Sequence, residues 1–250
     1  MKLFKKVLAG VAVAAAMASA HASPITVGGI TWDPDWFASS TSQDFKMEFS
    51  FTQFFVPAGP TIALNGYGEA FAMNGVSSDQ FSTTGGSAFS FAPGRELTFK
   101  LSGLNVTGTG LNTFSGGSLV LYSDNGNDFN NNINGPTGAG ATNTDLGGAW
   151  LILNAVSSQF VSNSPDVNNP LQSGQLTVQW EVTGGLAASN FDTNFYTTYD
   201  ARTRASAEFE NGFATGNGTF TANSIPEPES LALVGLGLLG LAAARRRKQA

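Results

Sequence analysis

The most regular pattern along the chain is an alternation of apolar and polar residues, which is typical of β-strands that bury one face. Residues 45–52 alternate phenylalanine and methionine with lysine, glutamate, serine and threonine, and residues 97–102 and 176–183 alternate in the same way. Each of these strands needs an apolar layer against its apolar face, so together they predict one shared β core.

Shorter or less regular alternation predicts six further strands. They are expected at residues 61–71, 87–91, 118–122, 149–156, 205–209 and 218–221. Glycine- and proline-rich segments separate the runs, and Gly216-Asn217-Gly218 is expected to form a tight hairpin, because glycine and asparagine tolerate a positive φ. No segment between the two ends of the chain shows helical periodicity. The predicted fold is therefore all-β, with a single β-sandwich or jelly-roll-like domain over residues 23–224.

Charge and composition narrow the functions open to this domain. Residues 23–226 contain five cationic and 16 acidic residues, a net charge of about −11, so no nucleic acid partner is expected. The chain has no cysteine, and its one histidine, His21, lies in the N-terminal segment. A Ser-His-Asp site, a Cys-His site and the common zinc sites all need these residues. We therefore expect no enzymatic activity, with a carboxylate-dependent glycosidase as the remote alternative.

The N-terminal segment has the three parts of a secretory signal peptide. Three lysines precede an apolar stretch at residues 7–18, and Ala20-His21-Ala22 follows it. Ala20 and Ala22 are the small residues that signal peptidase is expected to recognise, with cleavage after Ala22 and a signal peptide of residues 1–22. Cleavage after Ala20 is the alternative. Either site predicts export of the domain.

Residues 225–250 carry a second set of signals in a fixed order. A proline-rich motif comes first, an apolar run at 231–244 follows, and a basic cluster comes after it: Pro226, Glu227, Pro228, then Arg245, Arg246, Arg247 and Lys248. Fourteen residues make a helix of about 21 Å, which is short beside the roughly 20 residues of a full membrane crossing. The cations are expected to remain on the cytoplasmic side. This order predicts a short C-terminal membrane helix that anchors the protein transiently in the inner membrane.

This arrangement resembles the PEP-CTERM sorting signal of Gram-negative bacteria. The resemblance implies that exosortase reads Pro226, Glu227 and Pro228, that Arg245, Arg246 and Arg247 act as stop-transfer cations, and that the protein goes to the cell surface or the extracellular matrix. An ordinary tail anchor is the alternative.

A second resemblance involves the start of the domain. Residues 23–35, followed by 45–56, are similar to the flocculation-associated PEP-CTERM proteins. That resemblance implies a structural or adhesive role in flocculation and biofilm formation, with exopolysaccharide as the partner. It transfers no catalytic residue.

Two segments hold candidate binding residues. Trp32, Asp33, Asp35 and Trp36 combine aromatic rings with carboxylates, as a sugar-binding surface does, which makes a carbohydrate-binding module an alternative function. The competing interpretation is an N-terminal segment that its aromatic residues fasten to the domain.

The second segment is the long irregular stretch at residues 121–148. Its Asp124, Asp128 and Asn130 offer oxygen ligands of the kind that Ca²⁺ prefers. The EF-hand pattern fails, since Gly126 stands at its third position and no glutamate stands at its twelfth. A solvated asparagine-rich loop is the competing interpretation. No other cofactor is expected.

Overall fold

The computed structural model describes most of the domain between the two terminal segments. The described residues are 24–34, 44–59, 61–74, 76–77, 89–91, 95–107, 113–126, 128–129, 137–144, 147–163, 173–193, 198–210 and 213–225. They belong to one compact unit, Pro24–Glu227. The signal peptide, the apolar run at 231–244 and the residues of the predicted sorting signal lie outside the described residues.

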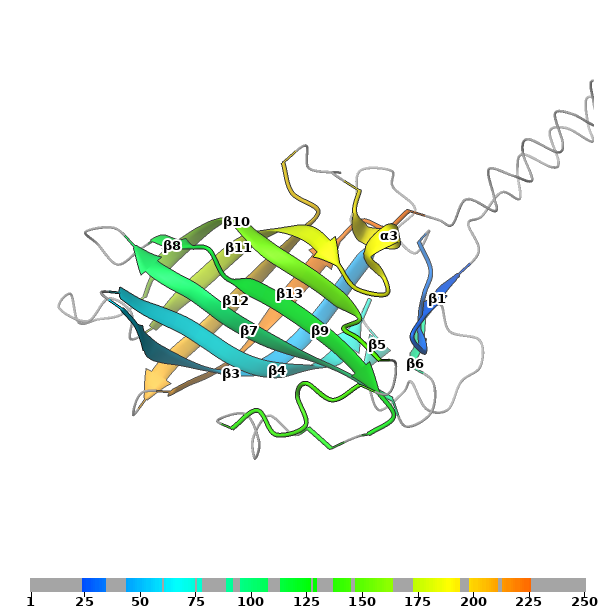
Figure 1. Cartoon of the computed structure of the whole chain (residues 1–250), viewed down its shortest axis with the longest axis horizontal. Coiled ribbons are helices and arrows are strands. Elements are labelled where there is room, and N and C mark those ends of the chain that lie inside the picture. The colour runs from blue at the N-terminus through cyan, green and yellow to red at the C-terminus, as the bar shows by residue number, and fades with distance from the viewer. Residues whose placement is uncertain are drawn as a thin grey trace, which may run out of the picture. The chain divides into compact units, whose positions relative to one another are not determined.

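The core of the fold is a closed, eight-stranded antiparallel β-barrel (Figure 1). Its strands are β3 (Phe45–Ala58), β4 (Thr61–Met73), β7 (Glu96–Thr107), β9 (Ser118–Asp124), β10 (Leu151–Ser162), β11 (Ser173–Gly184), β12 (Ala201–Glu210) and β13 (Phe213–Ala222). Each strand pairs with the next along the chain, and β13 pairs with β3 to close the ring. The barrel therefore has an up-and-down topology.

Short elements surround this ring. The short strand β5 (Val76–Ser77) pairs with β4, and β8 (Thr113–Ser115) pairs with β7. A separate three-stranded sheet consists of β1 (Ile25–Val27), β2 (Ile30–Trp32) and β6 (Phe89–Phe91). A single helical turn, α3 (Ala188–Phe191), lies at the same end of the barrel as β1 and β6 (Figure 1). No helix within the described ranges has both the length and the apolar character needed to cross a membrane.

Large apolar side chains fill the barrel interior. On β3 the inward positions include Phe45, Met47, Phe49 and Phe51, all at most 5% exposed. Two cavities lined by described residues measure about 30 and 20 Å³, which leaves room for one or two water molecules in each. The interior is thus a packed core, and these cavities are too small for a sugar or a lipid.

Glycines on β13 make room for the phenylalanines of β3. Gly216 faces Phe51 and Gly218 faces Phe49 across the strand pair. A Cβ on Gly218 would lie 2.5 Å from the Phe49 ring, which is inside van der Waals contact. The predicted hairpin at Gly216-Asn217-Gly218 is therefore wrong, because the segment runs through the middle of β13, where its glycines leave space for aromatic rings.

An aromatic cluster fills the end of the barrel near β2 and α3. Trp32 on β2 is fully buried. Its ring stacks on that of Phe191, with ring centroids 5.1 Å apart, and contacts Phe45 and Trp150 edge-on at 5.8 and 5.9 Å. These contacts fasten the N-terminal segment to the barrel.

Hydrogen bonds hold the same end together. The Trp32 indole N–H donates to Ser224 Oγ at 3.0 Å. The Ser224 N–H and hydroxyl donate in turn to the two carboxylate oxygens of Asp44, at 2.8 and 3.1 Å. The residues just before β3 and just after β13 are thus joined where the ring closes.

The prediction of a β-sandwich or jelly roll is wrong, although the all-β class and the three most regular strands are confirmed. A sandwich and a barrel both bury one face of each strand, so alternation does not distinguish them. The contacts that close the sheet identify a barrel, because β13 pairs with β3 along the whole of β13. Register shifts in the β3–β4, β4–β7 and β10–β11 pairs add the bends that a closed sheet needs.

Candidate functional site

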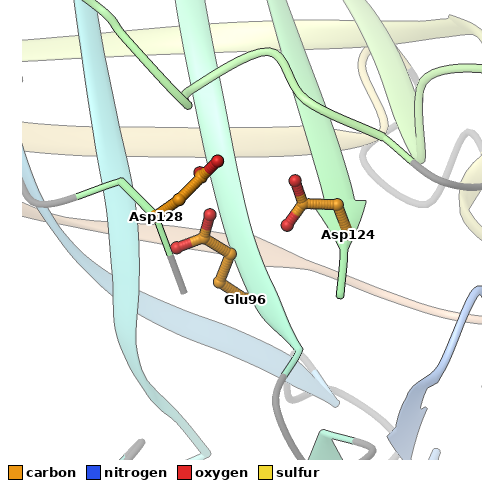
Figure 2. A group of neighbouring side chains, drawn as sticks. All are labelled: Glu96, Asp124 and Asp128. Atoms are coloured by element: carbon orange, nitrogen blue, oxygen red, sulfur yellow. The ribbon is translucent and has the colours of Figure 1, made fainter. Parts of the chain in front are cut away.

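Three carboxylates from separate parts of the chain converge on the outer surface of the barrel. Glu96 begins β7, Asp124 ends β9, and the two are directly opposed across the strand pair. Asp128 comes from the segment that follows β9. One carboxylate oxygen from each residue lies within 4.8 Å of those of the other two, and the side chains point toward one another in Figure 2. We call these three residues the carboxylate cluster.

The segment after β9 folds back over the barrel wall and brings Asp128 to the cluster. Phe129 and Ala141 in this segment are buried, at 2% and 0% exposure. The Thr98 hydroxyl on β7 donates to the Ala141 carbonyl at 3.0 Å, and the Asn143 amide donates to Asp128 Oδ2 at 2.7 Å. Apolar burial and side-chain hydrogen bonds together hold this part of the segment against β7.

Glu96 and Asp124 are both buried, with exposed fractions of 8% and 7%. Oε1 of Glu96 accepts a hydrogen bond from the Phe129 N–H at 3.4 Å. Its other oxygen, Oε2, is buried and accepts no hydrogen bond from any residue that the structure describes. Burial raises the pKa of Glu96 to about 8, and the negative charge of Asp124 adds to the rise. The Phe129 N–H acts in the opposite direction, whereas the neighbouring carboxylate of Asp128, which shares the proton of a protonated Glu96, raises the pKa further.

The raised pKa of Glu96 predicts that the metal-free protein loses stability as the pH increases. The folded state holds a proton on Glu96 up to about pH 8, whereas the unfolded chain releases it near the ordinary glutamate pKa of 4.5. The folded state therefore binds more protons between these values, and the free energy of unfolding falls as the pH rises through this range. Urea titrations in EDTA between pH 5 and pH 8 measure this slope.

The variant Glu96→Gln removes the titrating group and is expected to flatten this dependence. Glu208→Gln, which changes an exposed carboxylate on β12, serves as the control and is expected to keep the wild-type slope. An unchanged slope in Glu96→Gln would contradict the assignment.

A second acidic group has a different character. Glu181, Asp192 and Asp200 also lie within 4.8 Å of one another. Asp200 is fully buried, and its two oxygens accept hydrogen bonds from the Val182 and Thr193 N–H groups at 2.9 and 3.0 Å. Burial raises the pKa of Glu181, and the charges of Asp200 and Asp192 add to the rise. Because both oxygens of its buried member have backbone partners, this group is explained as a structural support.

The outer face of β11, β12, β13 and β3 is a polar wall. Side chains in cross-strand register form rows across these strands: Gln175, Ser206, Asn217 and Ser50; Thr177, Arg204, Thr219 and Glu48; Gln179, Arg202, Thr221 and Lys46. Lys46 makes an ion pair with Glu48 at 2.6 Å. The guanidinium groups of Arg202 and Arg204 make no hydrogen bond or ion pair with any described residue.

The structure describes two of the three predicted metal ligands. Asp124 and Asp128 lie together, and Asn130 lies outside the described residues. The ligand set predicted from the sequence lacks Glu96. The signal available for it was the alternation at 97–102, because extending that strand by one residue puts Glu96 on the polar face. Its distance from Asp124 depends on the β7–β9 register, which the alternation does not give.

Of the four predicted sugar-contacting residues, the structure describes Trp32 and Asp33. Trp32 is fully buried in the aromatic cluster, so its ring has no free face for a sugar, and the competing interpretation of a fastened N-terminal segment describes it better. Asp33 is partly exposed just after β2, and Asp35 and Trp36 lie outside the described residues.

The comparisons with known proteins concern the C-terminal segment. The family model of the PEP-CTERM protein-sorting motif matches residues 224–248. No curated protein and no solved structure matches the chain. The match confirms the resemblance to PEP-CTERM proteins and spans the predicted Pro226-Glu227-Pro228 motif and the arginine cluster, whereas the resemblance to flocculation-associated proteins stays a prediction. The chain thus carries a PEP-CTERM sorting motif, which identifies it as an exported protein processed by exosortase.

Proposed function

We propose that this protein is a non-enzymatic component of the cell surface or extracellular matrix, with a structural or adhesive role in flocculation and biofilm formation. Its partner in this proposal is exopolysaccharide, which it binds through the polar wall of the barrel. The sorting motif supports the destination, since it directs the protein out of the cell.

The polar wall is the observation that carries the proposal. Its rows of hydroxyl and amide groups match the hydroxyl groups of a polysaccharide, and they need no deep pocket. Arg202 and Arg204 are two residues apart on β12 and point outward, about 7 Å from each other. A guanidinium without a partner among the described residues is suited to bind a carboxylate through two parallel hydrogen bonds. The domain as a whole is acidic, but the three rows of the wall carry three cations, Lys46, Arg202 and Arg204, against one anion, Glu48. This face therefore fits a polysaccharide with carboxylates spaced along it, such as one that contains uronic acids.

The packed interior supports the same conclusion by elimination. The interior cavities of about 30 and 20 Å³ are far smaller than the several hundred Å³ of a ligand pocket. Binding on the outside of the barrel is weak for each contact, but many copies along one polymer add their contacts through multivalency. This is how a protein without a deep site contributes to cohesion.

Polysaccharide binding by an arginine-free variant tests the proposal. The double variant Arg202→Gln/Arg204→Gln is expected to bind a polyuronate at least about ten-fold more weakly, because each lost charge-assisted contact contributes on the order of 1 kcal/mol. Co-sedimentation and biolayer interferometry measure the change, with neutral dextran as the comparison polymer.

Lys100→Gln is the matched control, since Lys100 points outward from β7, which lies across the barrel from β12 in the strand order. This variant is expected to bind like the wild type. Equal loss in both variants would point to net charge alone and would contradict the polar wall as the binding surface. Failure of the wild type to bind any polysaccharide from its own matrix would overturn the adhesive function.

A further inference from the structure

We propose that the carboxylate cluster of Glu96, Asp124 and Asp128 binds one Ca²⁺ ion, which fastens the segment after β9 to the barrel wall. This site is separate from the polar wall and does not depend on the polysaccharide function. It differs from the site expected from sequence, because the third ligand is Glu96 from β7.

The spacing of the ligand atoms suits calcium. Ca²⁺ binds oxygen at about 2.3–2.6 Å, so two ligands on opposite sides of the ion are at most about 5 Å apart. The three carboxylate oxygens lie within 4.8 Å of one another, so one such ion can contact all three. Mg²⁺ requires near-ideal octahedral geometry at about 2.0–2.1 Å and gives up its water ligands reluctantly, so it is the weaker competitor for three protein carboxylates. All three protein ligands are hard oxygens, which favours Ca²⁺ over zinc or copper.

The buried oxygen of Glu96 is the observation that points to a ligand. Oε2 is shielded from solvent and has no hydrogen-bond donor among the described residues. The carboxylates of Asp124 and Asp128 lie beside the carboxylate of Glu96 (Figure 2). A buried carboxylate oxygen without a partner is costly. A cation at the centre of the cluster supplies the missing partner and offsets the repulsion that arises when all three carboxylates are ionised.

The position of the cluster gives the ion a structural effect. Glu96 and Asp124 belong to the barrel wall, and Asp128 belongs to the segment that folds over it. The Gly126 N–H donates to Asp124 Oδ1 at 3.1 Å and the Phe129 N–H donates to Glu96 Oε1, so the backbone on either side of Asp128 is already tied to two of the ligands. The ion therefore joins three parts of the chain at one point.

Calcium binding to the metal-stripped full chain tests the proposal. Equilibrium dialysis with ⁴⁵Ca²⁺ at pH 7.5 is expected to show one ion per chain, with a Kd in the range of about 0.1–1 mM that is typical of extracellular sites. Mg²⁺ is expected to compete at least ten-fold more weakly. Ca²⁺ at 100 times Kd is expected to raise the Tm by about 5–10 °C.

Two variants locate the ion. Glu96→Gln keeps the size of the side chain and is expected to weaken Ca²⁺ binding at least ten-fold and to abolish the Tm rise. Asp128→Asn, at an exposed position, is expected to weaken binding similarly and provides the test if Glu96→Gln folds poorly. Glu181→Gln, in the second acidic group, is the matched control and is expected to bind Ca²⁺ like the wild type.

Hydrogen exchange adds a local readout. The N–H groups of Gly126 and Phe129 are expected to exchange more slowly with Ca²⁺ present than in EDTA. The absence of saturable Ca²⁺ binding below 10 mM would overturn the proposal and leave a shared proton as the partner of Glu96. Wild-type binding in both Glu96→Gln and Asp128→Asn would overturn it as well.

Discussion

Replacing Trp32 by alanine is expected to lower the free energy of unfolding by about 3–5 kcal/mol, the usual cost of removing a buried tryptophan or phenylalanine side chain. The ring is fully buried and contacts Phe45, Trp150 and Phe191. The substitution also removes the N–H that donates to Ser224 Oγ. Because this cluster lies where β3 and β13 close the ring, the cavity left by the substitution destabilises the pairing of these two strands.

Urea unfolding of the full chain measures this loss, as a shift in the midpoint with an unchanged m-value. Phe213→Ala is the control, since Phe213 is 43% exposed on the outer face of β13 and is expected to cost less than about 1 kcal/mol. Trp32→Phe keeps an aromatic ring and is expected to fall between the two. Equal losses in Trp32→Ala and Phe213→Ala would refute the structural role of the aromatic cluster.

Replacing Pro226, Glu227 and Pro228 together by alanine is expected to abolish delivery of the protein to the cell surface. These residues lie within the matched sorting motif, and exosortase is expected to read them. The variant is expected to accumulate in cells with residues 245–248 still attached. Intact mass and terminal-peptide analysis of the cellular and extracellular fractions distinguish this form from processed protein.

The variant Arg202→Gln/Arg204→Gln is a suitable control here, because its sorting motif is intact and its delivery is expected to be normal. Replacing Arg245, Arg246 and Arg247 by neutral residues is expected to misplace the C-terminal segment by a separate route, the loss of the stop-transfer charge. Normal surface delivery of the Pro-Glu-Pro variant would contradict the role of this motif in sorting.

The strands were predictable from the sequence, whereas their closure into a ring was not. The alternation at residues 45–52 identified β3 correctly because each inward position carries a phenylalanine or methionine. The same alternation does not predict which strand lies beside β3. The pairing of β3 with β13 joins residues far apart in the chain. Gly216 and Gly218 were interpreted as turn residues because their spatial neighbours, Phe51 and Phe49, were unknown.

The candidate site was half predictable for the same reason. Asp124 and Asp128 are close in sequence, and their oxygen ligands were recognised there. Glu96 is 28 residues before Asp124 and joins it only through the β7–β9 register. The burial of Trp32 was also beyond the sequence alone, since a tryptophan beside aspartates is compatible with both a sugar-binding surface and a core residue.

The closed ring also bears on how this protein behaves when many copies are crowded together. An open β-sheet ends in a strand whose N–H and C=O groups have no partner, and such strands join edge to edge into aggregates. In the ring of eight strands every strand has a neighbour on both sides, so no strand of the ring is free along its whole length. The shortest pairing is that of β10 with β9, which covers Leu151–Asn154. Closure therefore lowers the tendency of the barrel strands to join copies of the protein edge to edge.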